Sequence, residues 1–228
     1  MLLKCGFAYD NIGYMNIKWY GQSCFQILAG SNKNGQISII IDPYDESIGL
    51  KLPRKMESDI ALVTHDHYDH NNVKKIVNNP FLIAGPGEYD VKGIFVQGIG
   101  SFHNEKKERN TIYKLEAEGI RLCHLGDLGQ KELTPEQLEA VGDVDILMIP
   151  IGGVYTIDGK EATKIMAQIE PKIIIPMHYK LPGLKIKLDS LDLFLRALGI
   201  KSLEKMPKLS VKAKDLPKEE VKIMVLEP

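Results

Sequence analysis

Short apolar runs bounded by Gly, Pro and Asn recur along most of the chain. Runs of this kind that are rich in Ile and Val predict β-strands. Two neighbouring runs separated by a polar, glycine-containing turn predict a hairpin, and this pattern occurs at 23–28 with 37–41 and again at 111–117 with 120–125. The predicted strands are residues 15–20, 23–28, 37–41, 60–63, 81–84, 94–99, 111–117, 120–125, 145–150, 172–176, 209–213 and 221–226.

Apolar residues at helical spacing predict helices at residues 71–79, 133–141, 160–169 and 188–198. The second has the clearest start, because Thr134 can cap it, Pro135 occupies its first position and Gln137 follows the cap by three residues. Gly199 closes the fourth. Residues 85–89 are predicted to form a turn, and residues 152–158 a loop.

Strands and helices alternate without a linker or a repeat, which predicts one α/β domain. We expect this domain to span residues 15–228. Residues 1–14 lack periodicity and are interpreted as an N-terminal extension.

Composition limits the classes of protein to which the chain can belong. The chain has 228 residues, 44% of them hydrophobic, which is enough for a substantial core. Its net charge of -1 provides no basic surface for nucleic acid or an anionic membrane, and no apolar run approaches the ~20 residues of a membrane span. The scattered Cys5, Cys24 and Cys123 do not form a disulfide framework and fit a reducing compartment. We therefore expect a cytoplasmic protein that acts on a small molecule; its oligomeric state is left open.

The densest chemistry lies directly after the predicted strand 60–63. Three histidines and two aspartates fall within the six residues 65–70. Imidazole and carboxylate groups are the ligands that suit zinc and related transition metals. His65 and His67 can point the same way on an extended backbone, and Asp69 and His70 could face a second ion. The alternative interpretation is a polar surface turn.

The pattern His65-x-His67-x-Asp69-His70 resembles the signature of the metallo-β-lactamase-fold hydrolases. Three later residues, His103, Asp127 and His178, each follow a predicted strand, in the order in which that family places its further ligands. Any one of them alone could be a packed or solvated residue. The resemblance implies an α/β (α+β) four-layer αββα sandwich, in which two mixed β-sheets are flanked by helices.

Carried over to this chain, the resemblance implies a dinuclear centre. His65, His67 and His103 would hold one metal, Asp69, His70 and His178 the other, and Asp127 would bridge them. Two divalent ions are implied, with Zn²⁺ favoured and Mn²⁺ or Fe²⁺ as alternatives. Asp69 and Asp127 are the predicted catalytic carboxylates. Asp42 is expected to support the ligand loop, or else only to open a turn.

The predicted function is a metal-dependent hydrolase that activates water for attack on an ester-like bond: a lactone, an ester or a phosphodiester. The alternative is a non-hydrolytic metal-binding protein of the same fold, with a di-iron redox or a scaffold role. His67 favours hydrolysis, because di-iron relatives usually carry Glu at that position. The branch that this chain most resembles is the ascorbate-6-phosphate lactonase-like one, through its Trp19-x-Gly21-x-Ser23-x-Phe25 and Pro176-Met177-His178-Tyr179 motifs.

Two differences from that branch stand out. Many of its members carry a His where this chain has Gln22, so Gln22 receives no role, and no basic cluster matches a sugar phosphate. Several other residues near the motifs are interpreted as structural. Asp66 is a loop-stabilising acid, His124 is buried and hydrogen-bonded, and residues 185–187 form a solvated edge. The loop residues Tyr155, Thr156, Tyr179 and Lys180 are interpreted as solvated, with hydrogen bonding to substrate as the alternative.

Overall fold

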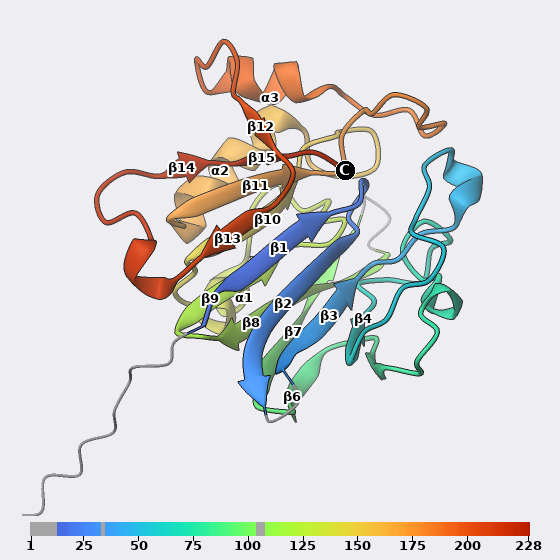
Figure 1. Ribbon diagram of the computed structural model, residues 1–228. Coiled ribbons are helices and arrows are strands. Elements are labelled where there is room, and N and C mark those ends of the chain that lie inside the picture. The colour runs from blue at the N-terminus through green and yellow to red at the C-terminus, as the bar shows by residue number, and fades with distance from the viewer. Residues whose placement is uncertain (1–12, 33–34, 104–107) are drawn as a thin grey trace, which may run out of the picture.

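The protein is built on two mixed β-sheets that pack face to face (Figure 1). A computed structural model describes residues 13–32, 35–103 and 108–228. The first sheet has the strand order β13-β1-β2-β3-β4-β5. Its strands are β1 (Met15–Trp19), β2 (Phe25–Asn32), β3 (Gly35–Ile41), β4 (Ile60–Leu62), β5 (Phe81–Ile83) and β13 (Leu209–Val211).

The second sheet has the order β14-β11-β10-β9-β8-β7-β6. Strands β9, β10, β11 and β14 run parallel, whereas β6 to β9 are antiparallel. Its strands are β6 (Gly87–Val91), β7 (Ile94–Phe102), β8 (Arg109–Ala117), β9 (Ile120–His124), β10 (Ile146–Pro150), β11 (Ile173–Met177) and β14 (Lys222–Ile223). A separate pair joins β12 (Lys205–Met206) to β15 (Val225–Leu226).

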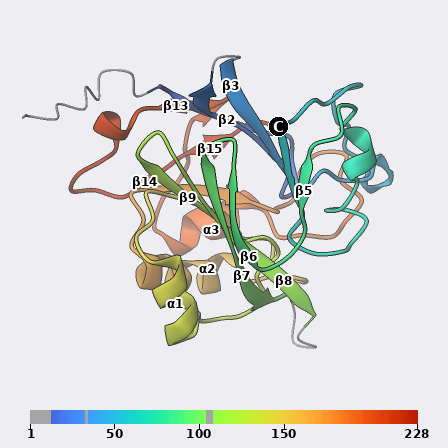
Figure 2. The ribbon, with the colours of Figure 1, turned by 90° about the horizontal axis from the view of Figure 1, so that it is seen from below.

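The helices cover the second sheet, on the side away from the first (Figure 2). They are α1 (Pro135–Val141), α2 (Gly159–Ile169) and α3 (Leu191–Ala197). The predicted capping box of α1 is present, since Thr134 Oγ1 accepts a hydrogen bond from Gln137 N and Gln137 Oε1 accepts one from Thr134 N. Because β10 is covered on both faces, all five of its residues are buried.

The outer face of the first sheet is covered differently. Two 3₁₀ turns, η1 (Glu46–Ile48) and η2 (Val73–Lys75), and irregular segments lie there. They enclose a small second core that includes Ile40, Tyr44 and Met56. The predicted fold class, two mixed sheets with flanking helices, is confirmed, but this outer layer contains no α-helix among the described residues.

The predicted helix at residues 71–79 is wrong, since only the η2 turn forms there. Asn72 Nδ2 donates to Tyr44 O, and Ile76 forms a β-bridge with Met56. These bonds to neighbouring segments compete with the helical pattern.

Two other predicted elements also differ. Residues 85–89 are predicted as a turn, but residues 87–89 belong to the edge strand β6, which pairs with β7. The single strand predicted at 221–226 is split, because β14 pairs with β11 and β15 pairs with β12. The predicted extension at 1–14 falls mostly outside the described residues.

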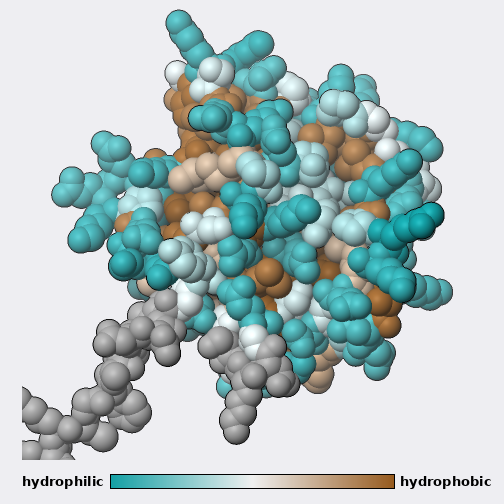
Figure 3. Space-filling model, in the orientation of Figure 1, coloured by the Kyte–Doolittle hydropathy of each residue, from teal (hydrophilic) through white to brown (hydrophobic). Residues whose placement is uncertain are grey.

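The surface seen in Figure 3 is mainly polar, with hydrophobic residues in several small groups. Such an arrangement is ordinary for a globular protein. Within the described ranges, none of the helices has the length and apolar composition needed to cross a bilayer.

A buried ion-pair network joins three strands of the second sheet at the end away from the predicted ligands. The Asp145 side chain is only 2% exposed. It accepts hydrogen bonds from Arg121 N at 2.9 Å, Arg121 Nε at 3.0 Å and Lys172 Nζ at 2.7 Å. These contacts hold the pKa of Asp145 below its usual range, although burial by itself would raise it.

We expect Asp145→Asn to lower the free energy of unfolding by about 2 kcal/mol, because charge-assisted bonds to a buried acceptor are lost. Asp143→Asn is the matched control. Asp143 pairs with the same Arg121, but its side chain is 85% exposed, so the cost should stay below about 1 kcal/mol. Urea unfolding of both variants measures the difference, and equal losses would contradict this account of Asp145.

Candidate metal centre

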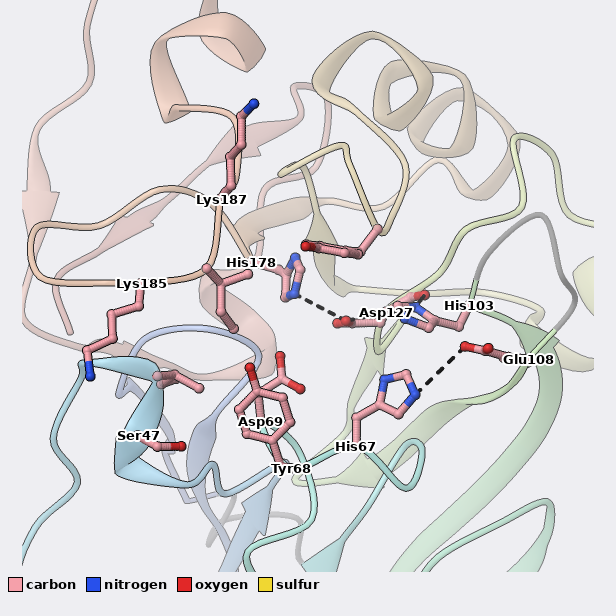
Figure 4. A pocket seen from close by; sticks show the side chains of 13 residues that line it. Ser47, His67, Tyr68, Asp69, His103, Glu108, Asp127, His178, Lys185 and Lys187 are labelled. Atoms are coloured by element: carbon pink, nitrogen blue, oxygen red, sulfur yellow. Dashed lines mark hydrogen bonds and ion pairs between the residues drawn. The ribbon is translucent and has the colours of Figure 1, made fainter.

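All seven predicted ligands meet in one cluster at one end of the sheets. Figure 4 shows the five that line the pocket: His67, Asp69, His103, Asp127 and His178. The seven residues come from four segments that follow strands β4, β7, β9 and β11. Three overlapping groups have ligand atoms within 4.8 Å of one another: His65, His67 and His103; Asp69, His70 and His178; and His65, His70 and Asp127. The first two groups are the two predicted metal sites, and the third takes one histidine from each together with Asp127.

In the first group the three imidazoles converge on one another. His65 Nε2 lies 3.1 Å from His67 Nδ1. His65 Nδ1 lies 3.0 Å from Thr64 Oγ1, and His103 Nδ1 lies 3.0 Å from the carbonyl oxygen of Asp127. A metal-binding histidine usually anchors its second ring nitrogen in this way. With the Nδ1 atoms of His65 and His103 held in this way, their Nε2 atoms are the ones that would face an ion.

The second group contains a buried nitrogen that the protein leaves without a hydrogen bond. His70 Nδ1 is held by Asp42 Oδ2 at 2.9 Å. His70 Nε2 lies 3.2 Å from Asp127 Oδ2 and 3.5 Å from Asp69 Oδ2, but it makes no hydrogen bond. A buried polar atom without a partner is costly. The imidazole and carboxylate donors around it fit a divalent transition-metal ion.

The electrostatics of the cluster favour the deprotonated, metal-binding forms of His65 and Asp127. Burial, helped by the neighbouring His70, lowers the pKa of His65 to about 3, so this imidazole is neutral at pH 7. Burial would raise the pKa of Asp127, but His178 and His70 hold it well below its usual range. The same carboxylate and Asp42 raise the pKa of His70.

Asp42 supports the ligand loop, as the sequence indicated. Its Oδ1 accepts from Thr64 N at 2.8 Å, and its Oδ2 accepts from Thr64 Oγ1 at 2.7 Å as well as contacting His70. Its backbone has a φ of 47°, a left-handed conformation that Asp and Asn tolerate better than most residues. One buried carboxylate thus fixes both the start and the end of the ligand stretch.

Gln22 supports the site in a way that the sequence did not indicate. The side-chain Nε2 of Gln22 donates to Asp69 Oδ2 at 3.0 Å. The backbone carbonyl oxygen of Gln22 accepts from Trp19 Nε1 at 2.9 Å and from His178 N at 3.0 Å. The neighbouring Ser23 Oγ donates to Asp127 Oδ1 at 3.1 Å. The residues next to Gln22 in the sequence could not predict this role, because its partners come from distant parts of the chain.

Some of the other residues near the motifs have the environment that the sequence predicted, and others do not. As predicted, His124 is buried and hydrogen-bonded: it accepts from Gly126 N at Nδ1, and its Nε2 lies 3.0 Å from Ser23 O. Asp66 is exposed and accepts from Asn71 Nδ2. Thr156 and Tyr179 are buried, so their interpretation as solvated residues is wrong. Tyr155 is 48% exposed.

An open pocket of about 700 Å³ lies over the cluster. His67, Asp69, His103, Asp127 and His178 line it from the cluster side, and its other lining residues are Ser47, Ile48, Tyr68, Glu108, Tyr155, Lys185, Ile186 and Lys187. Lys185 and Lys187 are exposed, as predicted for a solvated edge, but residues 185–187 also form part of the pocket wall, which the sequence did not indicate. A pocket of this size accommodates a small organic molecule.

A sequence model of the β-lactamase superfamily domain matches residues 16–178. The chain belongs to the β-lactamase superfamily. A solved structure from Thermotoga maritima, a candidate Zn-dependent hydrolase of the metallo-β-lactamase superfamily, is 34% identical with a TM-score of 0.75, and the match covers 93% of this chain and 100% of the other.

Two archaeal relatives are named UPF0173 metal-dependent hydrolases. The protein from Thermococcus onnurineus is 27% identical over 197 residues, or 72% of this chain and 84% of the relative. The protein from Thermoplasma acidophilum is 28% identical over 196 residues, or 72% and 83%. These relatives confirm the predicted superfamily and its enzyme class, metal-dependent hydrolase. The lactonase-like branch stays a prediction.

We expect Asp42→Asn to weaken zinc binding by about 10–100-fold, because the amide cannot accept from Thr64 and from His70 as the carboxylate does. Asn tolerates the left-handed backbone, so the change acts on hydrogen bonding. Competition with a chromophoric chelator gives the affinity. Asp66→Asn, which changes an exposed acid in the same stretch, should bind zinc as the unchanged protein does. Equal affinities for the two variants would contradict the role given to Asp42.

Proposed function

We propose that this protein is a hydrolase that uses two divalent cations, preferably zinc, to activate water for attack on an ester-like bond of a small molecule. His65, His67 and His103 would hold one cation. Asp69, His70 and His178 would hold the other, and Asp127 would lie between them. A lactone, a carboxylic ester and a phosphodiester are the candidate bonds.

The overlap of the three ligand groups carries the proposal of a pair of ions. His65 and His70 belong to separate sites, yet each also groups with Asp127. The Asp127 Oδ2 atom lies 3.2 Å from His70 Nε2 and 3.1 Å from His178 Nε2. Both of these histidines belong to the second set, and the grouping of Asp127 with His65 within 4.8 Å links the carboxylate to the first set, which supports a bridging role.

When bound, two such ions lower the pKa of water and polarise the oxygen of the bond under attack. The protein supplies orientation and a proton acceptor. Asp69 lines the pocket, and Gln22 holds its Oδ2 at 3.0 Å. Its Oδ1 has no hydrogen bond within the described parts of the chain, so this atom is the acceptor we assign for the proton of the attacking water.

The two cysteines among the described residues offer little support for a covalent thiol mechanism. Cys24 and Cys123 are both fully buried. Burial raises the pKa of Cys123 to about 12, and it raises that of Cys24 well above its usual value. Neither thiol lines the pocket.

The openness of the site favours hydrolysis over a scaffold role. A sealed pocket under the loop at residues 152–158 would support a scaffold protein. Tyr155 of this loop instead stands at the wall of the open pocket and is 48% exposed.

We expect the zinc-loaded protein to contain about two ions per chain and to hydrolyse at least one member of a panel of lactone, ester, phosphodiester and β-lactam substrates. His65→Ala should reduce this activity by more than about 100-fold, since a ligand is lost. Asp66→Ala, in the same stretch, should leave it nearly unchanged. An iron pair with redox activity and no hydrolysis would instead support the redox alternative.

A further inference from the structure

The segment at residues 181–188, here called the rim loop, forms one wall of the pocket. Its ends are joined by a hydrogen bond from Lys180 N to Asp189 O at 2.8 Å. Leu181 and Leu188 are buried. In its middle, Lys185 N donates to the carbonyl oxygen of Ile48 at 2.8 Å. The rim loop is therefore attached to the fold at both ends and at its centre.

A close backbone contact also fixes the rim loop against the η1 turn. Gly49 has a φ of 97°, and a Cβ added there would lie 2.1 Å from Gly183 O. Only glycine permits this approach. The backbone that carries Lys185, Ile186 and Lys187 is thus placed beside the pocket by specific contacts.

Lys185 and Lys187 have no ion-pair partner within the described ranges, although acidic residues are close in the fold. Glu46 of η1 pairs with Lys75 at 2.6 Å, and Asp45 accepts from Ser47 N at 2.9 Å. These two acids are therefore engaged elsewhere, which leaves both ammonium groups available to a ligand.

The pocket is asymmetric in charge. Figure 4 shows Lys185 and Lys187 on one side and Glu108 on the other, with Asp69 and His178 between them. Glu108 lies 3.7 Å from His67 Nε2. Both lysine ammonium groups lie at the rim, away from the cluster of histidines, and they point in different directions in Figure 4. Both side chains are exposed, so each can turn toward a ligand bound between them. A group bound by them would be remote from the bond that is cleaved.

We propose that Lys185 and Lys187 bind an oxyanion, a carboxylate or a phosphate, at the end of the substrate remote from the scissile bond. The substrate would then be a small organic anion whose ester-like bond lies over the metal cluster. Ile48 and Ile186, which also line the pocket, would contact its apolar middle part. This inference rests on the proposed function, since the same site cleaves the bond.

A small anion explains the rim better than a nucleic acid does. A nucleic-acid surface needs many cations along the path of the phosphates. Here the whole chain has a net charge of -1, and the opposite side of the pocket carries Glu108. Two cations on one side and an acid on the other suit a ligand with a single anionic end.

The test compares three nitrophenyl esters with the zinc-loaded protein: a neutral butyrate, a hemiglutarate with a distal carboxylate, and a phosphonobutyrate with a distal phosphonate. We expect higher kcat/KM for one or both anionic esters. The double variant Lys185→Gln/Lys187→Gln should lower this preference by about tenfold, mainly through KM, because the contact acts on substrate binding. Which anionic ester loses more identifies the preferred oxyanion.

Lys160→Gln/Lys164→Gln is the matched control, because it makes the same change in net charge on the exposed face of α2, outside the pocket. Its kinetics should match those of the unchanged protein. Hydrolysis of all three esters without a charge preference, or equal losses in both double variants, would overturn the anion subsite while leaving the hydrolase intact. Cleavage of a single-stranded RNA oligonucleotide that depends on Lys185 and Lys187, with no preference among the esters, would also overturn it.

If no ester is cleaved, the proposed function fails for ester bonds. A binding measurement then tests the anion subsite separately from hydrolysis. Calorimetric titration of the zinc-loaded protein with glutarate and with phosphonobutyrate should show about tenfold weaker binding to the rim-loop variant than to the control variant. Equal affinities would overturn the proposal.

Discussion

A buried carboxylate surrounded by imidazoles is the constraint on which the site depends. Asp127 is 2% exposed and lies at the end of β9 in the second sheet. It contacts His178, which follows β11 in the same sheet, and also Ser23 and His70 from loops of the first sheet. Burying such a charge is costly without partners. Because the partners of Asp127 come from both sheets, its contacts stabilise the observed arrangement of the two sheets at this end.

The hydrogen bonds around the cluster give the ligands their orientation before any ion arrives. Thr64, Asp42 and the Asp127 carbonyl oxygen hold the outer ring nitrogens of His65, His70 and His103, respectively. Gln22 does the same for one oxygen of Asp69. These contacts are built into loops attached to strands with a large apolar core between them. Metal binding here would consequently require little rearrangement, unlike in small domains that fold only around their metal.

The sequence was most informative where chemistry or capping is local. The ligand stretch at 65–70, the capping box of α1 and most of the strands could be predicted from neighbouring residues. Elements whose form depends on distant partners could not. The η2 turn and the split end of the chain are determined by pairing with Met56 and with β11 and β12. Gln22 was missed for the same reason, because its partners are Asp69 and the backbone of His178.

The rim loop shows why the type of a residue alone does not predict the role of that residue. Lys185 and Lys187 are exposed, and in the sequence they look like any lysines on a solvated edge. Their position at the rim of the pocket follows from two contacts that join distant parts of the chain, namely the contact of Gly49 with Gly183 and the hydrogen bond to Ile48. Under the proposals made above, substrate selection would depend on how irregular segments from both sheets meet beside the seven ligand residues. The ligand residues would determine the reaction, and these segments would determine which molecule can reach them.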